Sequence, residues 1–188
     1  LPMVFITTPG GREIPSKWED WLSGSSVTIY NPDWTVDYSG PTGIRGRGNS
    51  TWGYPKKPYA LKLDSKANIL GMPKHKRWVL LANWMDRTLL RNCVSFNLAD
   101  RTDLAYTPRG QFVEVFINGS HKGNYFLCEH IKVDENRVNI DELDEDETDG
   151  GYIMELDSYF DETYKFRSER RGLPYMFKDP DEVTPEQF

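Results

Sequence analysis

The sequence is poor in cysteine, in long apolar runs and in net positive charge, and each shortage excludes a class of protein. Its two cysteines, Cys93 and Cys128, are too few for a cysteine-rich zinc site. Both lie inside apolar stretches, so two buried thiols are the favoured interpretation and a disulfide is the alternative. No stretch approaches the roughly 18 apolar residues of a membrane-spanning helix. The net charge of −6 offers no basic footprint for non-specific binding of nucleic acid.

Common catalytic signatures are missing as well. The three histidines, His75, His121 and His130, have no HExxH or similar spacing, so no metal site is predicted. The sequence has no GxSxG element, and neither cysteine has an obvious histidine partner, which disfavours nucleophilic hydrolysis. The first residues, LPMVFITT, are typical of a strand and not of a charged signal peptide.

Aromatic residues, in contrast, are plentiful. Six Trp, ten Tyr and nine Phe indicate a folded chain, because disordered segments are poor in aromatics. Short β-branched or alternating runs predict strands at 3–8, 26–31, 58–64, 78–84 and 151–160. Segments rich in glycine, proline or charge predict loops at 32–43, 71–77 and 141–149.

Two longer patterns complete the expected secondary structure. Residues 86–102 have helical apolar spacing, with Asp86 or Thr88 as the cap. Residues 111–131 form a predicted β-hairpin around Asn118-Gly119. A short helix is also expected at 15–21, where Ser16 and Glu19 have the spacing of a capping box. No closing helix or strand is recognisable after residue 161. These elements predict an α+β fold with a mainly antiparallel sheet, one prominent helix and a hairpin.

The stretch RGRGNSTWGYPKKPYALKLD, residues 45–64, concentrates positive charge beside flexible backbone. Its glycines allow backbone N–H groups to approach an anion closely, and Arg45 and Arg47 suit bidentate phosphate binding. Lys62, on the following strand, adds a point charge. Lys56 and Lys57 receive no role, because the strand alternation begins only after Pro58. The alternative is an arginine-rich surface turn, since the stretch matches neither GxGxxG nor GxxxxGK[ST].

Several carboxylates lie at strand positions, among them Glu129, Glu155 and Asp157. Glu129 follows the apolar run YFLC, and a buried glutamate is rare unless it is paired. A kinase-like site uses a glutamate to hold its lysine and carboxylates to hold Mg²⁺. A structural ion pair between Glu129 and an arginine such as Arg45 or Arg91 is the alternative.

Five segments, taken together and in order, resemble the spore coat protein H (CotH) kinase family. They are LPMVFITT, RGRGNSTW with PKKPYALKL, WVLLANWMDRTLLRN, VEVFINGSHKGNYFLCEHI and GGYIMELD, and they cover most of residues 1–157. The resemblance implies a divergent protein-kinase-like fold, one domain over residues 1–188, and ATP and Mg²⁺ as cofactors.

The resemblance also implies roles for particular residues. Arg45, Arg47 and Lys62 would lie on the nucleotide phosphates, and Glu129 would orient the lysine. Glu155 and Asp157 would lie near the nucleotide or the hinge. Three residues would support the helix that packs on the site, namely Asp86, Arg91 and Asn92.

The expected function is transfer of the γ-phosphoryl group of ATP to Ser or Thr of a coat or exported protein. No catalytic motif is recognisable in residues 158–188, so we expect the catalytic residues beyond Phe188 and an inactive fragment. The alternative is a non-catalytic extracellular module, associated with the cell surface or with carbohydrate, that keeps the fold. An exported location, in the periplasm, cell surface or spore coat, follows from the resemblance alone.

Overall fold

The computed structural model describes residues 1–141, 143, 147–180 and 182–188. The chain divides into two compact units, Leu1–His130 and Ile131–Phe188. Each unit is treated separately below. Within the described ranges, no helix combines the length and the apolar character that crossing a bilayer requires.

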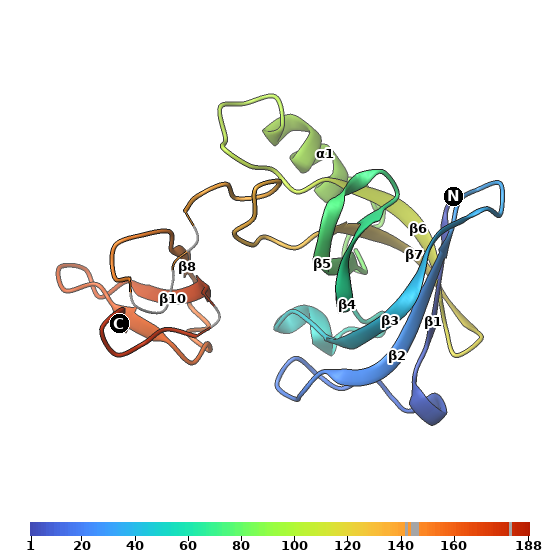
Figure 1. Cartoon of the computed structure of the whole chain (residues 1–188), viewed down its shortest axis with the longest axis horizontal. Coiled ribbons are helices and arrows are strands. Elements are labelled where there is room, and N and C mark those ends of the chain that lie inside the picture. Colours follow the sequence, from blue (N-terminus) through green and yellow to red (C-terminus); the bar gives the residue numbers. More distant parts are fainter. Residues whose placement is uncertain (142, 144–146, 181) are drawn as a thin grey trace. The chain divides into compact units, whose positions relative to one another are not determined.

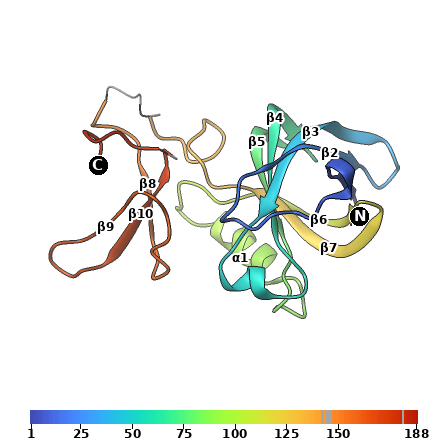
Figure 2. The same cartoon turned by 90° about the horizontal axis from the view of Figure 1, so that it is seen from below.

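The first unit is a closed seven-stranded barrel (Figures 1 and 2). Its strands follow the order β1-β2-β3-β4-β5-β7-β6 around the barrel. Neighbours are antiparallel except at one seam, where β1 and β6 pair in parallel and close the sheet. The bounds are β1 Met3–Thr7, β2 Leu22–Tyr30, β3 Val36–Gly46, β4 Tyr59–Ile69, β5 Met72–Leu81, β6 Gly110–Ile117 and β7 Ser120–Glu129.

Strand alternation fills the barrel with apolar side chains. In β4, Leu61 and Leu63 are buried, whereas Lys62 and Asp64 between and after them are exposed, as the period-two pattern predicted. Trp78 of β5, opposite Leu61, is also buried within this core. The barrel wall therefore has one apolar face and one face that carries charge.

The single α-helix of the described residues, α1 (Arg91–Ala99), covers part of the outer wall. Its Cys93 and Phe96 pack on a small apolar cluster that β5 and β7 contribute, made of Val79, Phe126 and Cys128. Both cysteines are free thiols; Cys128 is buried and Cys93 is half-buried. The helix is shorter than the predicted 86–102.

The predicted hairpin is confirmed as β6 and β7. Its turn residues Asn118 and Gly119 have positive φ values of 50° and 77°, which suit the right-handed twist of the two strands. Two short 3₁₀ helices, η1 (Pro9–Gly11) and η2 (Ser50–Gly53), lie in connections between strands.

The second unit contains a three-stranded antiparallel sheet in the order β8-β10-β9. Its strands are β8 (Ile153–Leu156), β9 (Lys165–Arg167) and β10 (Pro174–Asp179). The strand predicted at 151–160 is thus present but shorter. The expectation that nothing closes the chain after residue 161 is wrong, because β9 and β10 lie there. The acidic run predicted as a loop falls partly outside the described residues.

The predicted α+β, kinase-like fold is wrong: the described residues are mostly β, with a closed barrel and one α-helix. Residues 17–19 form a turn and not a helix, although Glu19 accepts hydrogen bonds from the Ser16 N–H (2.9 Å) and Oγ (2.8 Å). The segments 32–43 and 71–77, predicted as loops, contribute to β3 and β5. The composition of these two segments predicted loops wrongly, because pairing with distant strands satisfies their backbone hydrogen bonds despite their low strand propensity. The prediction of one family domain over 1–188 stays a prediction.

Candidate functional site

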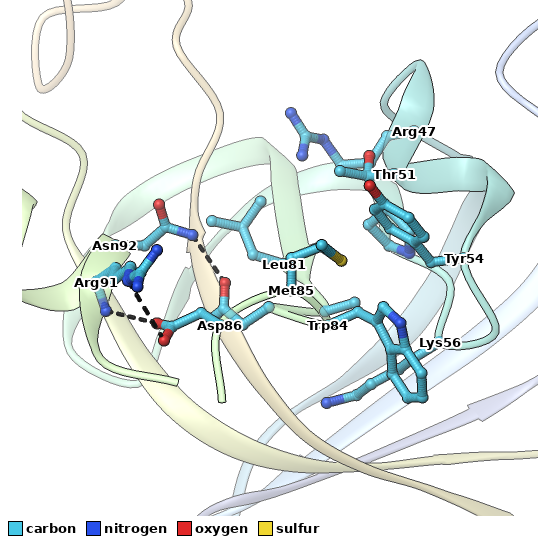
Figure 3. Close-up of a pocket in the computed structure, with 13 residues that line it drawn as sticks. Arg47, Thr51, Tyr54, Lys56, Leu81, Trp84, Met85, Asp86, Arg91 and Asn92 are labelled. Atoms are coloured by element: carbon cyan, nitrogen blue, oxygen red, sulfur yellow. Dashed lines mark hydrogen bonds and ion pairs between the residues drawn. The ribbon is translucent and has the colours of Figure 1, made fainter. Parts of the chain in front are cut away.

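A pocket of about 430 Å³ lies in the first unit, between the segment after β3 and the segment after β5 (Figure 3). Its polar lining comes from both segments: Arg47, Thr51, Tyr54 and Lys56 from the first, and Asn83, Asp86, Arg91 and Asn92 from the second. Trp84 and Met85 add apolar surface. The two walls have different local chemistry.

The first wall is a tight loop that returns the chain from β3 to β4. The Arg47 N–H donates a hydrogen bond of 3.2 Å to the Pro58 carbonyl, which ties the two ends of the loop together. Gly48 has φ +78°, and a Cβ atom there would lie 1.9 Å from Thr51 Oγ1. Only glycine therefore fits this position, and it sets how closely Arg47 and Thr51 approach each other in the pocket.

Lys56, at the end of this loop, is half-buried against β7. Its Nζ donates a hydrogen bond to the Asn124 carbonyl and lies 4.5 Å from the centroid of the Tyr125 ring. Burial lowers the pKa of Lys56, and the negative charge of Glu114 opposes this effect in part. The Lys56 ammonium is thus held in place at the edge of the pocket.

The second wall is a network that fixes the start of α1. Asn83, which has a positive φ of 50°, donates from Nδ2 to the Leu89 carbonyl (3.1 Å) and accepts from Asn92 Nδ2 (2.7 Å). Asp86 accepts hydrogen bonds from Thr88 Oγ1 (2.6 Å) and from the Arg91 N–H (2.8 Å). These bonds, with Thr88 the largest contribution, lower the pKa of Asp86. The prediction of Asp86 or Thr88 as the cap residue is wrong, because Leu90 occupies the N-cap position, although Asp86 accepts a hydrogen bond from the first N–H of the helix.

The pocket brings together four of the predicted site residues: Arg47, Asp86, Arg91 and Asn92. It also contains Lys56, to which the sequence assigned no role. The only local signal for Lys56 was its place in the basic stretch, because the contact that fixes it is with Asn124, 68 residues away. Three cationic side chains thus line one pocket beside exposed aromatic surface, an arrangement that suits an anionic ligand with a flat ring.

Arg45 and Lys62 lie elsewhere, on the outer wall of the barrel. In the β3–β4 register Arg45 is opposite Ala60 and Lys62 is opposite Gly43. The guanidinium carbon of Arg45 lies 4.4 Å from the centroid of the Trp21 ring. Neither residue lines the pocket that contains Arg47.

Glu129 has an arginine partner inside the barrel end. Its carboxylate accepts two side-chain hydrogen bonds from Arg109 (3.0 and 2.9 Å), one from the Arg109 N–H (2.9 Å) and one from the Tyr106 hydroxyl (3.0 Å). Glu129 thus forms the structural ion pair with an arginine that was the alternative interpretation. The partner is Arg109 and not Arg45 or Arg91.

Lys62 and Glu129 lie on opposite faces of the barrel wall. Cross-strand partners share a face, so Leu61, Trp78 and Glu129 face inward, whereas Lys62 faces outward with Arg77. The structure therefore does not bring together the lysine and the glutamate that the resemblance would pair.

Glu155 and Asp157 belong to the second unit. Glu155 Oε2 lies 3.4 Å from Lys178 Nζ, and Asp157 Oδ1 accepts the Tyr159 N–H at 3.2 Å. Their place near a nucleotide stays a prediction. Within the described part of the chain, no group of three or more His, Cys, Asp or Glu side chains is arranged to hold a metal ion.

The fold and the pocket define a small β-barrel domain with a cation-lined site between two loop segments. Comparison with protein families assigns residues 44–188 to the CotH kinase protein family. The chain therefore belongs to the CotH kinase family, as its five segments suggested, and at the level of the family its function is kinase-like. The matched range begins within β3, so β1 and β2 precede it. A search of curated proteins gave no match.

Proposed function

We propose that the chain is a kinase-like domain that binds ATP in the pocket between β3 and α1. In the complete reaction the γ-phosphoryl group of ATP would pass to a Ser or Thr hydroxyl of a coat or other exported protein. The observation that carries this proposal is the presence of three cationic residues, Arg47, Lys56 and Arg91, in the lining of one pocket. Membership of the CotH kinase family supports it independently.

The pocket chemistry suits a nucleoside triphosphate in two ways. Arg47 and Arg91 present forked guanidinium groups to phosphate oxygens, and Lys56 adds a point charge. Trp84, whose exposed fraction is 48%, offers an indole face on which a purine ring can stack. Positioning and neutralisation of charge are the main tasks of a protein in phosphoryl transfer, and these side chains perform both.

Mg²⁺ belongs to the proposal without assigned ligands. Asp86 is the carboxylate of the pocket, and both of its oxygens already accept hydrogen bonds at the start of α1. Because no suitable cluster occurs among the described residues, we derive no step that passes through the metal. For the same reason we assign no catalytic base to this chain.

The test is thermal unfolding with and without Mg-ATP. A ligand present at about 100 times its Kd stabilises a folded protein by about 2.7 kcal/mol, so a rise in Tm is expected. Arg47→Ala and Lys56→Ala should each remove most of this rise. Lys62→Ala is the matched control, because Lys62 carries the same charge as Lys56 but lies on the outer wall.

Three results bear on the proposal. If millimolar Mg-ATP leaves the Tm of the wild-type chain unchanged, nucleotide binding by this chain is wrong. If Lys62→Ala abolishes the rise and Lys56→Ala does not, the nucleotide lies on the outer wall, as the strand-lysine prediction had it. If both lysine variants keep the full rise, neither residue contacts phosphate.

A second candidate, a non-catalytic exported module with this β-barrel fold, is favoured by one observation. Lys62 and Glu129 face opposite sides of the barrel wall, so the lysine–glutamate pair of an active kinase is not formed by these two residues. Radiolabelled ATP separates the candidates. Transfer of label to an added protein or to the chain itself supports the kinase, whereas a chain that neither binds Mg-ATP nor transfers label supports the module.

A further inference from the structure

We propose that the outer wall of the barrel at β3, β4 and β5 binds an acidic polysaccharide, in a groove separate from the Arg47 pocket. This inference does not depend on nucleotide binding. It rests on the distribution of charge over the wall, on the cross-strand register, and on two adjoining clefts lined by tryptophan.

Positive charge is strongly segregated in this part of the chain. Residues 45–77 contain nine of the 23 Lys and Arg residues and one of the 29 Asp and Glu residues. The remainder of the chain is correspondingly acidic. Within this segment, Lys62, Lys76 and Arg77 belong to β4 and β5, and Arg45 belongs to β3. A chain with a net charge of −6 thus contains one strongly basic sheet surface.

The register places like charges directly opposite each other. Lys62 of β4 is the cross-strand partner of Arg77 of β5, and like charges directly opposite each other on a sheet repel. Arg45 and Arg77 both lie against Trp21, with guanidinium carbons 4.4 and 5.0 Å from its ring centroid. No ion pair joins Lys62 to any other residue that the structure describes. The cations are therefore concentrated around one indole ring.

Trp21 lies at the junction of two clefts. One, of about 630 Å³, is lined by Trp21, Lys62, Asp64 and Lys76, together with Asp20 and Ser23. The other, of about 940 Å³, shares Asp20, Trp21 and Ser23 and continues to Trp18 and Trp52. The two clefts adjoin at these three shared residues, an elongated arrangement that suits an extended polymer better than a compact ligand.

The mixed chemistry of the groove favours a sugar polymer over an acidic peptide. The clefts also contain the carboxylates Glu13, Glu19, Asp20 and Asp64, which repel the charges of any polyanion. These carboxylates accept hydrogen bonds from hydroxyl groups, which a polyuronate has and a chain of acidic side chains lacks. Trp18 has an exposed fraction of 62%, and an indole packs well on the apolar face of a sugar ring. The barrel is closed, so a peptide finds no strand edge to extend here. Lysines 62 and 76 are placed to meet the uronate carboxylates.

The experiment measures binding of a long oligogalacturonate to the full chain by tryptophan fluorescence and calorimetry. Two other probes are compared at equal chain length: the fully methyl-esterified oligomer, which is neutral, and poly-L-glutamate. The oligogalacturonate is expected to bind at least about tenfold more tightly than either, because only it offers both carboxylates and hydroxyls.

Variants locate the site. The double variant K62A/K76A and the single variant Trp18→Ala should each weaken oligogalacturonate binding by about tenfold or more. Lys122→Ala, an exposed lysine of β7, removes one charge outside the groove and should leave the affinity unchanged. Lys56→Ala tests independence from the nucleotide pocket and should also have no effect. All these lysines and Trp18 lie at exposed or half-buried positions, and an unchanged Tm checks that each variant is folded.

Five outcomes overturn the proposal. They are no binding of oligogalacturonate, equal binding of poly-L-glutamate, equal binding of the neutral oligomer, equal loss in Lys122→Ala and K62A/K76A, and loss in Lys56→Ala alone. Equal binding of poly-L-glutamate would identify an acidic protein as the partner instead. Loss of binding in Lys56→Ala alone would place the sugar in the Arg47 pocket.

Discussion

Different kinds of contact stabilise the interior of each of the two units. The barrel has a continuous core of twenty buried residues drawn from all seven strands, and its strands are paired on both sides. The second unit buries few apolar side chains, chiefly Met176, Phe177 and Val183. It adds aromatic contacts, such as Phe166 stacked on Tyr175 at 5.6 Å between centroids.

Polar contacts contribute more to the stability of the second unit than to that of the barrel. Lys132 Nζ donates to the Lys178 carbonyl at 2.9 Å, and Lys178 forms ion pairs with Glu155 and Glu162. Burial lowers the pKa of Lys178, but the hydrogen bond and charge of Glu162, with help from Glu155, outweigh it and raise the pKa overall. A small unit with little apolar area depends on such contacts, whereas a closed barrel depends on its core. The predictions below test this contrast.

The largest effect is expected from matched truncations of the two cores. Leu80→Ala in β5 and Met176→Ala in β10 each remove a side chain with 0% exposure. Leu80→Ala should lower the free energy of unfolding of the barrel by about 2–5 kcal/mol. Met176→Ala should act on residues 131–188 alone. Hydrogen exchange followed by mass spectrometry resolves the two units, and loss of protection in β1–β7 on Met176→Ala would show that they unfold together.

Glu129→Ala, at the end of the barrel, should cause a smaller loss of unfolding free energy. This change leaves Arg109 and the Tyr106 hydroxyl without their carboxylate partner. The cost should be about 2–3 kcal/mol, reduced from that of a fully buried pair because the Arg109 side chain is 45% exposed. Denaturant unfolding measures it.

Glu114→Ala is the control for Glu129→Ala. Glu114 pairs with His121 at 2.7 Å on the barrel surface, and losing a pair of this kind should cost under about 1 kcal/mol. If Glu129→Ala leaves stability unchanged but abolishes binding of Mg-ATP, the result would support the role of orienting a lysine that the family resemblance implied for Glu129.

The parallel seam that closes the barrel is the next target. Phe5 of β1 stacks on Phe116 of β6 with centroids 4.7 Å apart and meets Tyr30 edge-on at 5.7 Å. Phe5→Ala should destabilise the barrel by about 1–2 kcal/mol, through lost area and lost ring contacts. Trp34→Ala, at a ring that is 64% exposed, should change stability by less than about 0.5 kcal/mol. Equal effects in thermal unfolding would mean that the seam does not limit stability.

The smallest effect concerns pH and the start of α1. The folded pKa of Asp86 is lowered, so its contribution to stability is present above the ordinary carboxyl pKa and is lost as pH falls through the folded value. Asp86→Asn should therefore be less stable than wild type at neutral pH, and the difference should be smaller at about pH 3. Urea midpoints at the two pH values measure this. A constant difference would assign the effect to geometry and not to charge.

The sequence predicted local features well where one segment decides the outcome. The Asn118-Gly119 hairpin, the alternation of Leu61, Lys62 and Leu63, and the contact of Asp86 with the start of α1 were all predictable, because neighbours along the chain fix them. The prediction failed at 32–43 and 71–77. There, proline, glycine and lysine are accepted in β3 and β5 because partner strands supply the hydrogen bonds.

The same distinction holds for the site. Family membership and the residues Arg47, Asp86, Arg91 and Asn92 came from the sequence, since they lie in segments with recognisable patterns. Lys56 was missed because a carbonyl on a distant strand fixes it. The basic stretch 45–64 was predicted to form one anion site. In the barrel, Arg47 and Lys56 line the pocket, whereas Lys62 lies on the outer wall.

The sequence by itself thus determined the family, the presence of strands and their buried faces, and the concentration of positive charge. The tertiary structure alone decided that the sheet closes, because β1 and β6 meet across more than 100 residues. It also decided that Lys62 faces away from Glu129, because the side of a wall on which a residue lies depends on register. Register depends on every strand pairing around the barrel, and no local pattern contains it.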